Sequence, residues 1–212
     1  MTKKVGQVAA LASEILSRRK VDRRCVVAVS GAPASGKTTL AEKLARQLTD
    51  LGHAAQVVPM DGFHLDNRLL DQRGLRARKG APETFDLRGF AGLVAALSVE
   101  PEVVYPLFDR GLDMAIAGAG CIHSECKIAV VEGNYLLLDE PGWSNLTRNW
   151  DISIHLKVSE PELRKRLVTR WLNHGLNQQE AETRAEQNDL KNARRIAAAL
   201  KPYDIEFELE TP

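Results

Sequence analysis

Apolar positions along the chain follow two periods, one typical of buried strands and one of amphipathic helices. Residues 25–31 (CVVAVSG) form a continuous apolar, β-branched run, which predicts a strand buried on both faces. In the next segment, residues 37–48, leucines and alanines recur at helical spacing along one stripe. The pattern therefore predicts a buried strand that leads within a few residues into an amphipathic helix.

The same alternation continues along the rest of the chain. Further helices are predicted at 4–19, from Asp86 to about Leu97, at 160–173 and at about 178–200, and further strands at 56–60, 102–109, 127–133, 151–158 and 203–209. Asp86 is expected to cap its helix, and the spacing of Ser159 and Glu162 fits a capping box. Strands that alternate with helices favour an α/β fold with a doubly wound parallel sheet.

Composition narrows the class of protein. The chain has 212 residues, 44% apolar and 27% charged, which suits a single domain over residues 1–212. A net charge of +1 and 5% aromatic residues give no reason to expect nucleic acid or an acidic membrane surface as a partner. The odd count of three cysteines without a CxxC pair suggests neither a disulfide framework nor a zinc site, and no segment is predicted to be a signal peptide or a membrane span. We therefore expect a cytoplasmic protein.

The strongest chemical signal lies between the first buried strand and its helix. The segment Gly31, Ala32, Pro33, Ala34, Ser35, Gly36, Lys37, Thr38 fits the pattern G-x-x-x-x-G-K-[ST] at every position, and Thr39 follows it. In this pattern the glycines let backbone N–H groups surround phosphates, the lysine reaches the outer phosphates, and the hydroxyl residue binds Mg²⁺. The sequence therefore predicts a nucleotide-phosphate site, with the helix N-terminus adding to it.

Two predicted strands end on carboxylates. Glu132 closes the strand at 127–133, and Asp61 follows the strand at 56–60. The carboxyl ends of parallel strands meet at the ligand-binding edge of a sheet, so Glu132 is expected near Thr38 as a magnesium ligand. Asp61 would then lie where an alcohol must approach the γ-phosphate, and could act as its base. The alternative for Asp61 is an ordinary turn residue.

The motifs together resemble a known family. The order GAPASGKTT, MDGFHLDN…RGLRARKGAPETFDL and VVEGNYLLL is similar to phosphoribulokinase, uridine kinase and bacterial pantothenate kinase, and with YPLFDR it is closest to bacterial fructose-transport-system kinases. The resemblance implies a nucleoside-kinase-like P-loop fold with a helical lid at about 160–178, and phosphoryl transfer from ATP with Mg²⁺ to a small-molecule hydroxyl. It implies that Asp61 is the base, that Arg166 and Arg170 of the lid contact phosphates, and that Asn188 and Asn192 flank the adenine.

The acceptor is less well defined. Its pocket is predicted to include His64, Asn67, Asp61, Tyr105, Arg110, Asn134 and Tyr135. The chain is shorter than bacterial pantothenate kinases, and its FDR segment differs from that of uridine kinases, so neither acceptor is favoured. The basic run Arg73, Arg76, Arg78, Lys79 is interpreted as a solvated connector, with attraction of an anionic acceptor as the alternative. Trp143, Trp150 and Trp171 are interpreted as packing residues.

Two further functional expectations stay open. Relatives in this family often dimerise, so a homodimer is possible for this chain as well. The alternative to a kinase is a nucleotide-dependent regulatory ATPase with no small-molecule acceptor; a GTPase is not favoured, since the sequence has no N-K-x-D motif.

Overall fold

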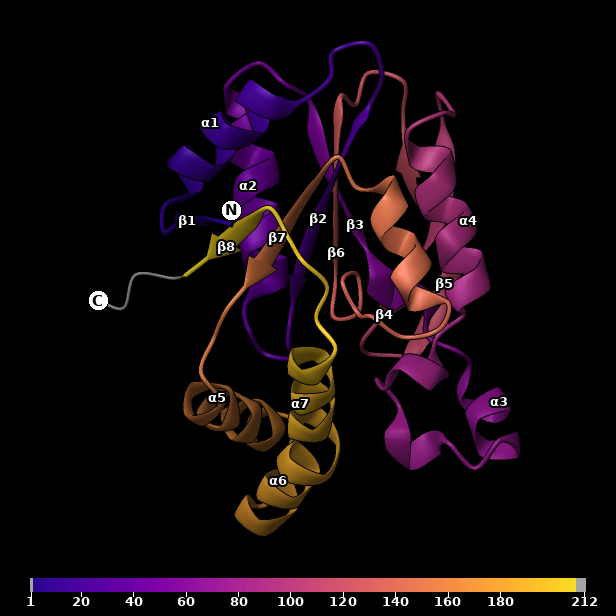
Figure 1. Cartoon of the computed structure of the whole chain (residues 1–212). Helices are drawn as coiled ribbons and strands as arrows, with labels where there is room; N and C mark the ends of the chain where they lie inside the picture. Colours follow the sequence, from indigo (N-terminus) through magenta and orange to yellow (C-terminus); the bar gives the residue numbers. More distant parts are fainter. Residues whose placement is uncertain (1, 209–212) are drawn as a thin grey trace.

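The computed structural model describes residues 2–208 and contains a six-stranded parallel sheet (Figure 1). The strand order is β1-β8-β7-β2-β6-β3, and every neighbouring pair is parallel. The strands are β1 Lys3–Val5, β2 Cys25–Gly31, β3 Ala55–Pro59, β6 Ile128–Gly133, β7 Ile152–Leu156 and β8 Ile205–Phe207. The doubly wound α/β prediction is confirmed; residue 209, the last of the predicted final strand, lies outside the described residues.

Helices cover both faces of the sheet and its carboxyl edge. Helices α1 and α2 lie on one face and α4 on the other, while α5, α6 and α7 lie beyond the carboxyl ends of the strands (Figure 1). Their bounds are α1 Val8–Arg18, α2 Lys37–Asp50, α3 Asn67–Gln72, α4 Leu87–Leu97, α5 Glu160–Asn173, α6 Gln178–Arg184 and α7 Lys191–Ala198. Short turns of helix are η1 Met60–Phe63, η2 Arg76–Arg78, η3 Pro82–Thr84, η4 Trp143–Asn149 and the π-helical η5 Ala185–Leu190.

The central strand β2 serves two cores at once. Val26 and Ala28 pack into the core beneath α4, whereas Val27 and Val29 pack into the core beneath α1 and α2. All seven residues of β2 are buried. Successive side chains of a strand point to opposite faces, so the continuous apolar run of this segment is what a sheet covered on both faces requires.

The segment at 102–109 has a different role from the other predicted strands. It forms β4 Val103–Asp109, which pairs antiparallel with β5 Met114–Ile122 in a separate two-stranded sheet. The sequence of β5, MAIAGAGCI, has four consecutive exposed residues and little alternation, so periodicity did not predict it. The hairpin turn between the strands, which includes Asp113 at a φ of 53°, places residues 110–113 near the carboxyl edge of the main sheet.

Two predictions at element ends were wrong and one is confirmed. Residues 3–5 form β1, which extends the sheet beside β8, so the first helix begins only at Val8. Ser159 precedes α5, but its hydroxyl makes no capping bond within the described chain, and the Glu162 carboxylate pairs with Arg166 rather than with the Ser159 N–H. Asp86 caps α4 as predicted and accepts a hydrogen bond from the Gly89 N–H at 2.9 Å.

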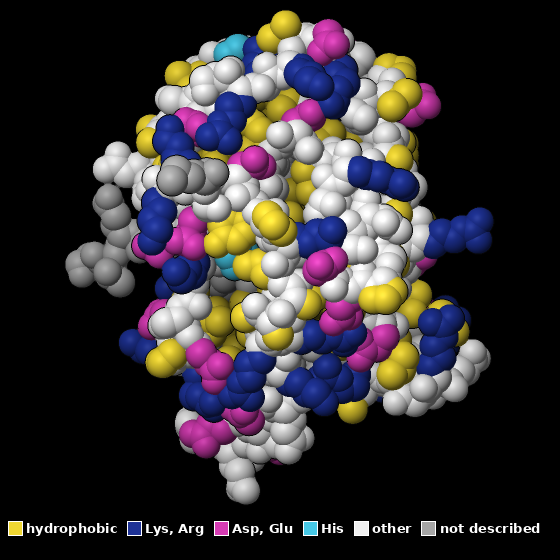
Figure 2. Space-filling view, in the orientation of Figure 1, with side chains coloured by type: hydrophobic (Ala, Val, Ile, Leu, Met, Phe, Trp, Pro, Cys, Tyr) yellow, Lys and Arg dark blue, Asp and Glu magenta, His cyan; other side chains and the backbone are white. Residues whose placement is uncertain are grey.

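Charged side chains of both signs gather in the lower part of the face seen in Figure 2, at the level of α5 and α7. Ion pairs join these elements: Arg194 of α7 contacts Glu160 of α5 at 2.6 Å and Glu186 of η5 at 2.6 Å. Helix α5 is therefore held to η5 and α7 on its outer side. Among residues 2–208, no helix is long and apolar enough to cross a lipid bilayer.

Candidate functional site

The loop between β2 and α2 has the geometry of a phosphate cradle. Ala34 and Gly36 have φ values of 61° and 95°, which turn the backbone sharply before α2 begins. A Cβ atom at Gly31 would lie 2.6 Å from the Ser35 Oγ and 3.2 Å from the Leu156 carbonyl oxygen, so this position requires glycine. Within the described residues no side chain caps α2, and its first N–H groups face the loop for an anion to accept.

Thr38 and Glu132 meet where α2 begins and β6 ends. The Thr38 Oγ1 donates a hydrogen bond to the Glu132 Oε1 at 3.1 Å, as the predicted proximity of these residues requires. Glu132 is 4% exposed, and burial raises the pKa of its carboxyl group, while the nearby Lys37 ammonium lowers it. A buried carboxylate beside a hydroxyl and a phosphate cradle suits Mg²⁺, which prefers hard oxygen ligands.

Asp61 lies in η1, directly after β3, and faces two partners. Its Oδ2 is 3.6 Å from the Arg110 Nη2, which the β4–β5 hairpin supplies. Its backbone carbonyl accepts a hydrogen bond from the His64 Nδ1 at 2.7 Å. A carbonyl oxygen can only accept, so Nδ1 carries the proton; burial lowers the pKa of His64, and a neutral ring leaves Nε2 as an acceptor.

A cleft of about 830 Å³ joins the phosphate cradle to Asp61 and His64, and Glu132 is not among its lining residues. Of the predicted site residues, its lining includes Pro33, Ala34, Gly36, Lys37, Thr38, Thr39, Asp61, His64, Arg110, Asn134 and Arg170. The Asn134 Oδ1 is buried and has no hydrogen-bond partner among the described residues, and the same holds for the Ser35 Oγ. The P-loop, the end of β3, the hairpin tip and α5 thus converge on one site.

Three predicted acceptor residues have other partners. Tyr105 is 3% exposed, and its hydroxyl donates to the Val57 carbonyl at 3.2 Å. Tyr135 is fully buried and donates to the Gly80 carbonyl at 2.5 Å. The Asn67 amide is held by Asp113 and Lys79 at 2.8 and 2.7 Å. Tyr105 and Tyr135 therefore support the walls of the cleft from the core, and Asn67 supports the hairpin tip.

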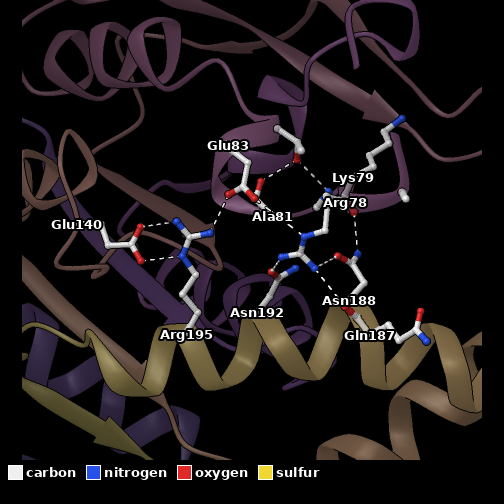
Figure 3. A network of polar contacts seen from close by, with 12 residues as sticks. Arg78, Lys79, Ala81, Glu83, Glu140, Gln187, Asn188, Asn192 and Arg195 are labelled. Atoms are coloured by element: carbon white, nitrogen blue, oxygen red, sulfur yellow. Dashed lines mark hydrogen bonds and ion pairs between the residues drawn. The ribbon is translucent and has the colours of Figure 1, made fainter. Parts of the chain in front are cut away.

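The two asparagines expected beside the adenine are also engaged. Arg78 donates to the Oδ1 of Asn188 at 2.6 Å and to the Oδ1 of Asn192 at 2.8 Å (Figure 3). Both asparagines are buried, at 2% and 1% exposure. Arg166 lies against the P-loop, as its Nη1 donates to the Ser35 carbonyl at 3.1 Å.

Several cleft residues were missed by sequence reasoning. The interpretation of the basic run as a solvated connector was wrong for two of its members, because Lys79 has an 11% exposed side chain paired with Asp113, and Arg78 binds the asparagines. Others that line the cleft are Arg76, Gly80, Phe108, Asp113, Trp171, His174, Leu176, Arg184 and Asp189. The Trp171 indole donates to the buried Asp189 carboxylate at 2.7 Å. The guanidinium carbons of Arg170 and Arg184 lie 5.5 and 5.3 Å from the centroid of the Trp171 ring. Only the density of basic residues in RGLRARKG signalled any of this.

Comparisons with known proteins place the chain. No protein-family profile matches it. It is 38% identical over 190 residues to the uncharacterized protein YggC of Escherichia coli K12, covering 88% of this chain and 78% of that one. It is 33% identical over 196 residues to the "putative uridine kinase C227.14" of Schizosaccharomyces pombe, covering 88% of this chain and 83% of the relative.

A solved structure is more similar still. The crystal structure described as a "putative fructose transport system kinase" from Silicibacter sp. TM1040 shares 55% identity and superposes with a TM-score of 0.93, covering 95% of this chain and 99% of that one. The protein is a kinase, and its chain belongs to the P-loop kinase family that includes uridine kinase and pantothenate kinase.

Proposed function

We propose that the protein transfers the γ-phosphoryl group of ATP to a hydroxyl group of a small molecule, and that Asp61 is the base. The observation that carries this proposal is that Asp61 faces the same cleft as Lys37 and Thr38. A P-loop needs no such carboxylate to bind a nucleotide, whereas an alcohol acceptor needs a group that takes or orients its proton.

The residues present fit Mg-ATP. The left-handed Ala34 and Gly36, the required glycine at position 31 and the free N-terminus of α2 form an anion cradle. Lys37 would contact the outer phosphates, and Thr38 and Glu132 would hold Mg²⁺. The bound ion would supply positive charge against the phosphate oxygens.

The acceptor would lie between Asp61 and the hairpin tip. The Asp61 carboxylate and the free Nε2 of His64 are hydrogen-bond acceptors for hydroxyl groups, and the Asn134 amide adds a donor and an acceptor. Arg110 adds a positive charge at the rim, with a 60% exposed side chain. We place a lid at about 160–178, where Arg166 already contacts the P-loop and Arg170 lines the cleft.

The proposal is tested by ADP release with Mg-ATP over a panel of nucleosides, pantothenate, ketoses, aldoses and their phosphates. One panel member should stimulate turnover in the parent, and Asp61→Asn should lose that stimulation by roughly 10²–10⁴-fold while still binding ATP. Asp109→Asn is the matched control, because this exposed carboxylate lies on the β4–β5 hairpin that supplies Arg110 and accepts only the Leu112 N–H at 2.9 Å within residues 2–208. Equal slow hydrolysis by parent and Asp61→Asn across the panel would favour the regulatory ATPase instead.

A further inference from the structure

The basic connector at 76–80 is in contact with two parts of the molecule. On one side Arg76, Lys79 and Gly80 line the cleft. Between them, Arg78 points the other way, toward η5 and α7 (Figure 3). In the proposed phosphoryl transfer the connector forms one wall of the cleft, but Arg78 itself has no role.

Arg78 is bonded on several sides by the helical segment. Its Nη1 donates to the Asn188 Oδ1 at 2.6 Å and to the Gln187 carbonyl at 3.3 Å, and its Nη2 donates to the Asn192 Oδ1 at 2.8 Å. The Asn188 Nδ2 in turn donates a hydrogen bond to the Lys79 carbonyl at 3.0 Å. The planar guanidinium fork matches these acceptors, and a lysine ammonium at the same place does not.

The π-helical turn η5 connects this contact to the lid side of the cleft. Asn188 and Asp189 are consecutive and both buried, yet Asn188 binds Arg78 while Asp189 accepts from the Trp171 indole of α5. Single π-turns inside helices frequently occur at functional sites. The same α5 is bonded to the P-loop through Arg166 and the Ser35 carbonyl.

We infer that Arg78 is a positioning residue that transmits nucleotide binding at the P-loop to the connector wall of the cleft. The contacts form a continuous path that begins at Ser35 and runs through Arg166 along α5 to Trp171. From Trp171 the path continues through Asp189 into η5, and from η5 to Arg78. Ordering the P-loop and α5 around a nucleotide would then also fix the connector, which lies beside the acceptor position. The inference rests on the proposed function for its effect on catalysis, but the coupling itself needs no acceptor.

A spatial path is not coupling by itself, so the test measures coupling directly. Hydrogen exchange of the backbone amides at 76–81 is followed with and without Mg²⁺ and a non-hydrolysable ATP analogue, in the parent, Arg78→Lys and Arg195→Lys. Arg195 is the matched control, because this arginine lies on α7, the helix that carries Asn192, and forms ion pairs with Glu140 and Glu83 (Figure 3). Asn192→Ala is a second variant that removes one acceptor of Arg78 and leaves the connector sequence intact.

The nucleotide analogue should slow exchange at 76–81 by roughly fivefold or more in the parent and in Arg195→Lys. In Arg78→Lys the slowing should fall below about twofold, with an intermediate value in Asn192→Ala, while P-loop amides stay protected in all four. Equal connector protection in parent and Arg78→Lys, equal loss in Arg195→Lys, or no connector protection in the parent would overturn the inference. If the nucleotide analogue does not slow exchange of the P-loop amides in the parent, the proposed function is overturned too. If no acceptor of the panel stimulates ADP release, the proposed function fails but the coupling result is unaffected.

Discussion

The Thr38 hydroxyl donates to the Glu132 carboxylate across 3.1 Å, which joins the first turn of α2 to the last residues of β6. Glu132 is almost fully buried, and burial raises its pKa against the opposing effect of Lys37. A hydroxyl and one lysine therefore compensate this carboxylate only in part. We propose that a divalent cation bound at the phosphate cradle completes this compensation.

Replacing Glu132 by Gln should separate catalysis from folding. The amide keeps the hydrogen bond from Thr38 and removes the charge that would hold Mg²⁺, so turnover should fall by about a hundredfold or more. The midpoint of thermal unfolding should stay at or above that of the parent, because a buried charge is removed. ADP release measured against Mg²⁺ concentration checks the first effect, with exposed Glu125→Gln as control. Parent-like turnover and Mg²⁺ dependence in Glu132→Gln would remove Glu132 from the metal site.

Arg110 should determine whether the site prefers an anionic acceptor to a neutral one. Its guanidinium is 3.6 Å from Asp61 and largely exposed, so it is free to bind a carboxylate or phosphate on the acceptor. Arg110→Gln should raise KM for an anionic acceptor by roughly tenfold, and should change KM for a neutral analogue less than about twofold. Steady-state kinetics on matched sugar and sugar-phosphate pairs measure this, with exposed Arg148→Gln as control. The same KM change for both members of a pair would show that Arg110 does not read acceptor charge.

Local patterns predicted the parts of the fold that rest on local physics. The buried run of β2 and the stripe of α2 give the P-loop its position, and the cap of α4 by Asp86 follows from its side chain. The strand ends at Asp61 and Glu132 could be placed at one edge because the sheet is parallel. The edge of the sheet that carries the P-loop and these two carboxylates could therefore be predicted from the sequence.

The rest depends on contacts between distant segments. The partner of β4 is β5, whose small residues have no clear period, and the partner of β1 is the strand at the far end of the chain. Arg78 is 110 residues from Asn188, so nothing in the connector itself indicates that it binds a helix. Tyr105 and Tyr135 carry hydroxyl groups that suit a pocket, and only the structure shows that these are satisfied within the core.

Gly62 should be intolerant of any side chain. A Cβ there would lie 2.0 Å from the Pro106 carbonyl oxygen, so η1 and β4 would have to separate and Asp61 would move with η1. Gly62→Ala should therefore destabilise the fold by about 1–3 kcal/mol and lower turnover as well. Gly92→Ala is the matched control, because a Cβ there meets nothing within 4 Å and α4 should gain up to about 1 kcal/mol. Denaturant unfolding checks both, and equal stability of the two variants would contradict the close approach of η1 to β4.

His155 should make the fold sensitive to acid. The residue lies in β7 and its ring packs against Tyr203; its Nδ1 is buried and has no hydrogen-bond partner among residues 2–208. Burial lowers the pKa of His155 to about 4; the Glu206 carboxylate opposes this shift and the Lys157 ammonium adds to it. A histidine in the unfolded chain has a pKa near 6.5, so between pH 4 and pH 6.5 His155 is largely protonated in the unfolded chain and largely neutral in the folded chain. Stability should therefore fall as pH drops from about 6.5 to about 4, by up to roughly 3 kcal/mol from this residue. His155→Phe should lose that part of the dependence in urea unfolding at stepped pH, and the same substitution at exposed His174 controls for the added apolar area. If the free energy of unfolding falls equally with pH in the parent and in His155→Phe, the buried ring is not the acid-sensitive group. Protonation of other groups must then account for the loss of stability at low pH.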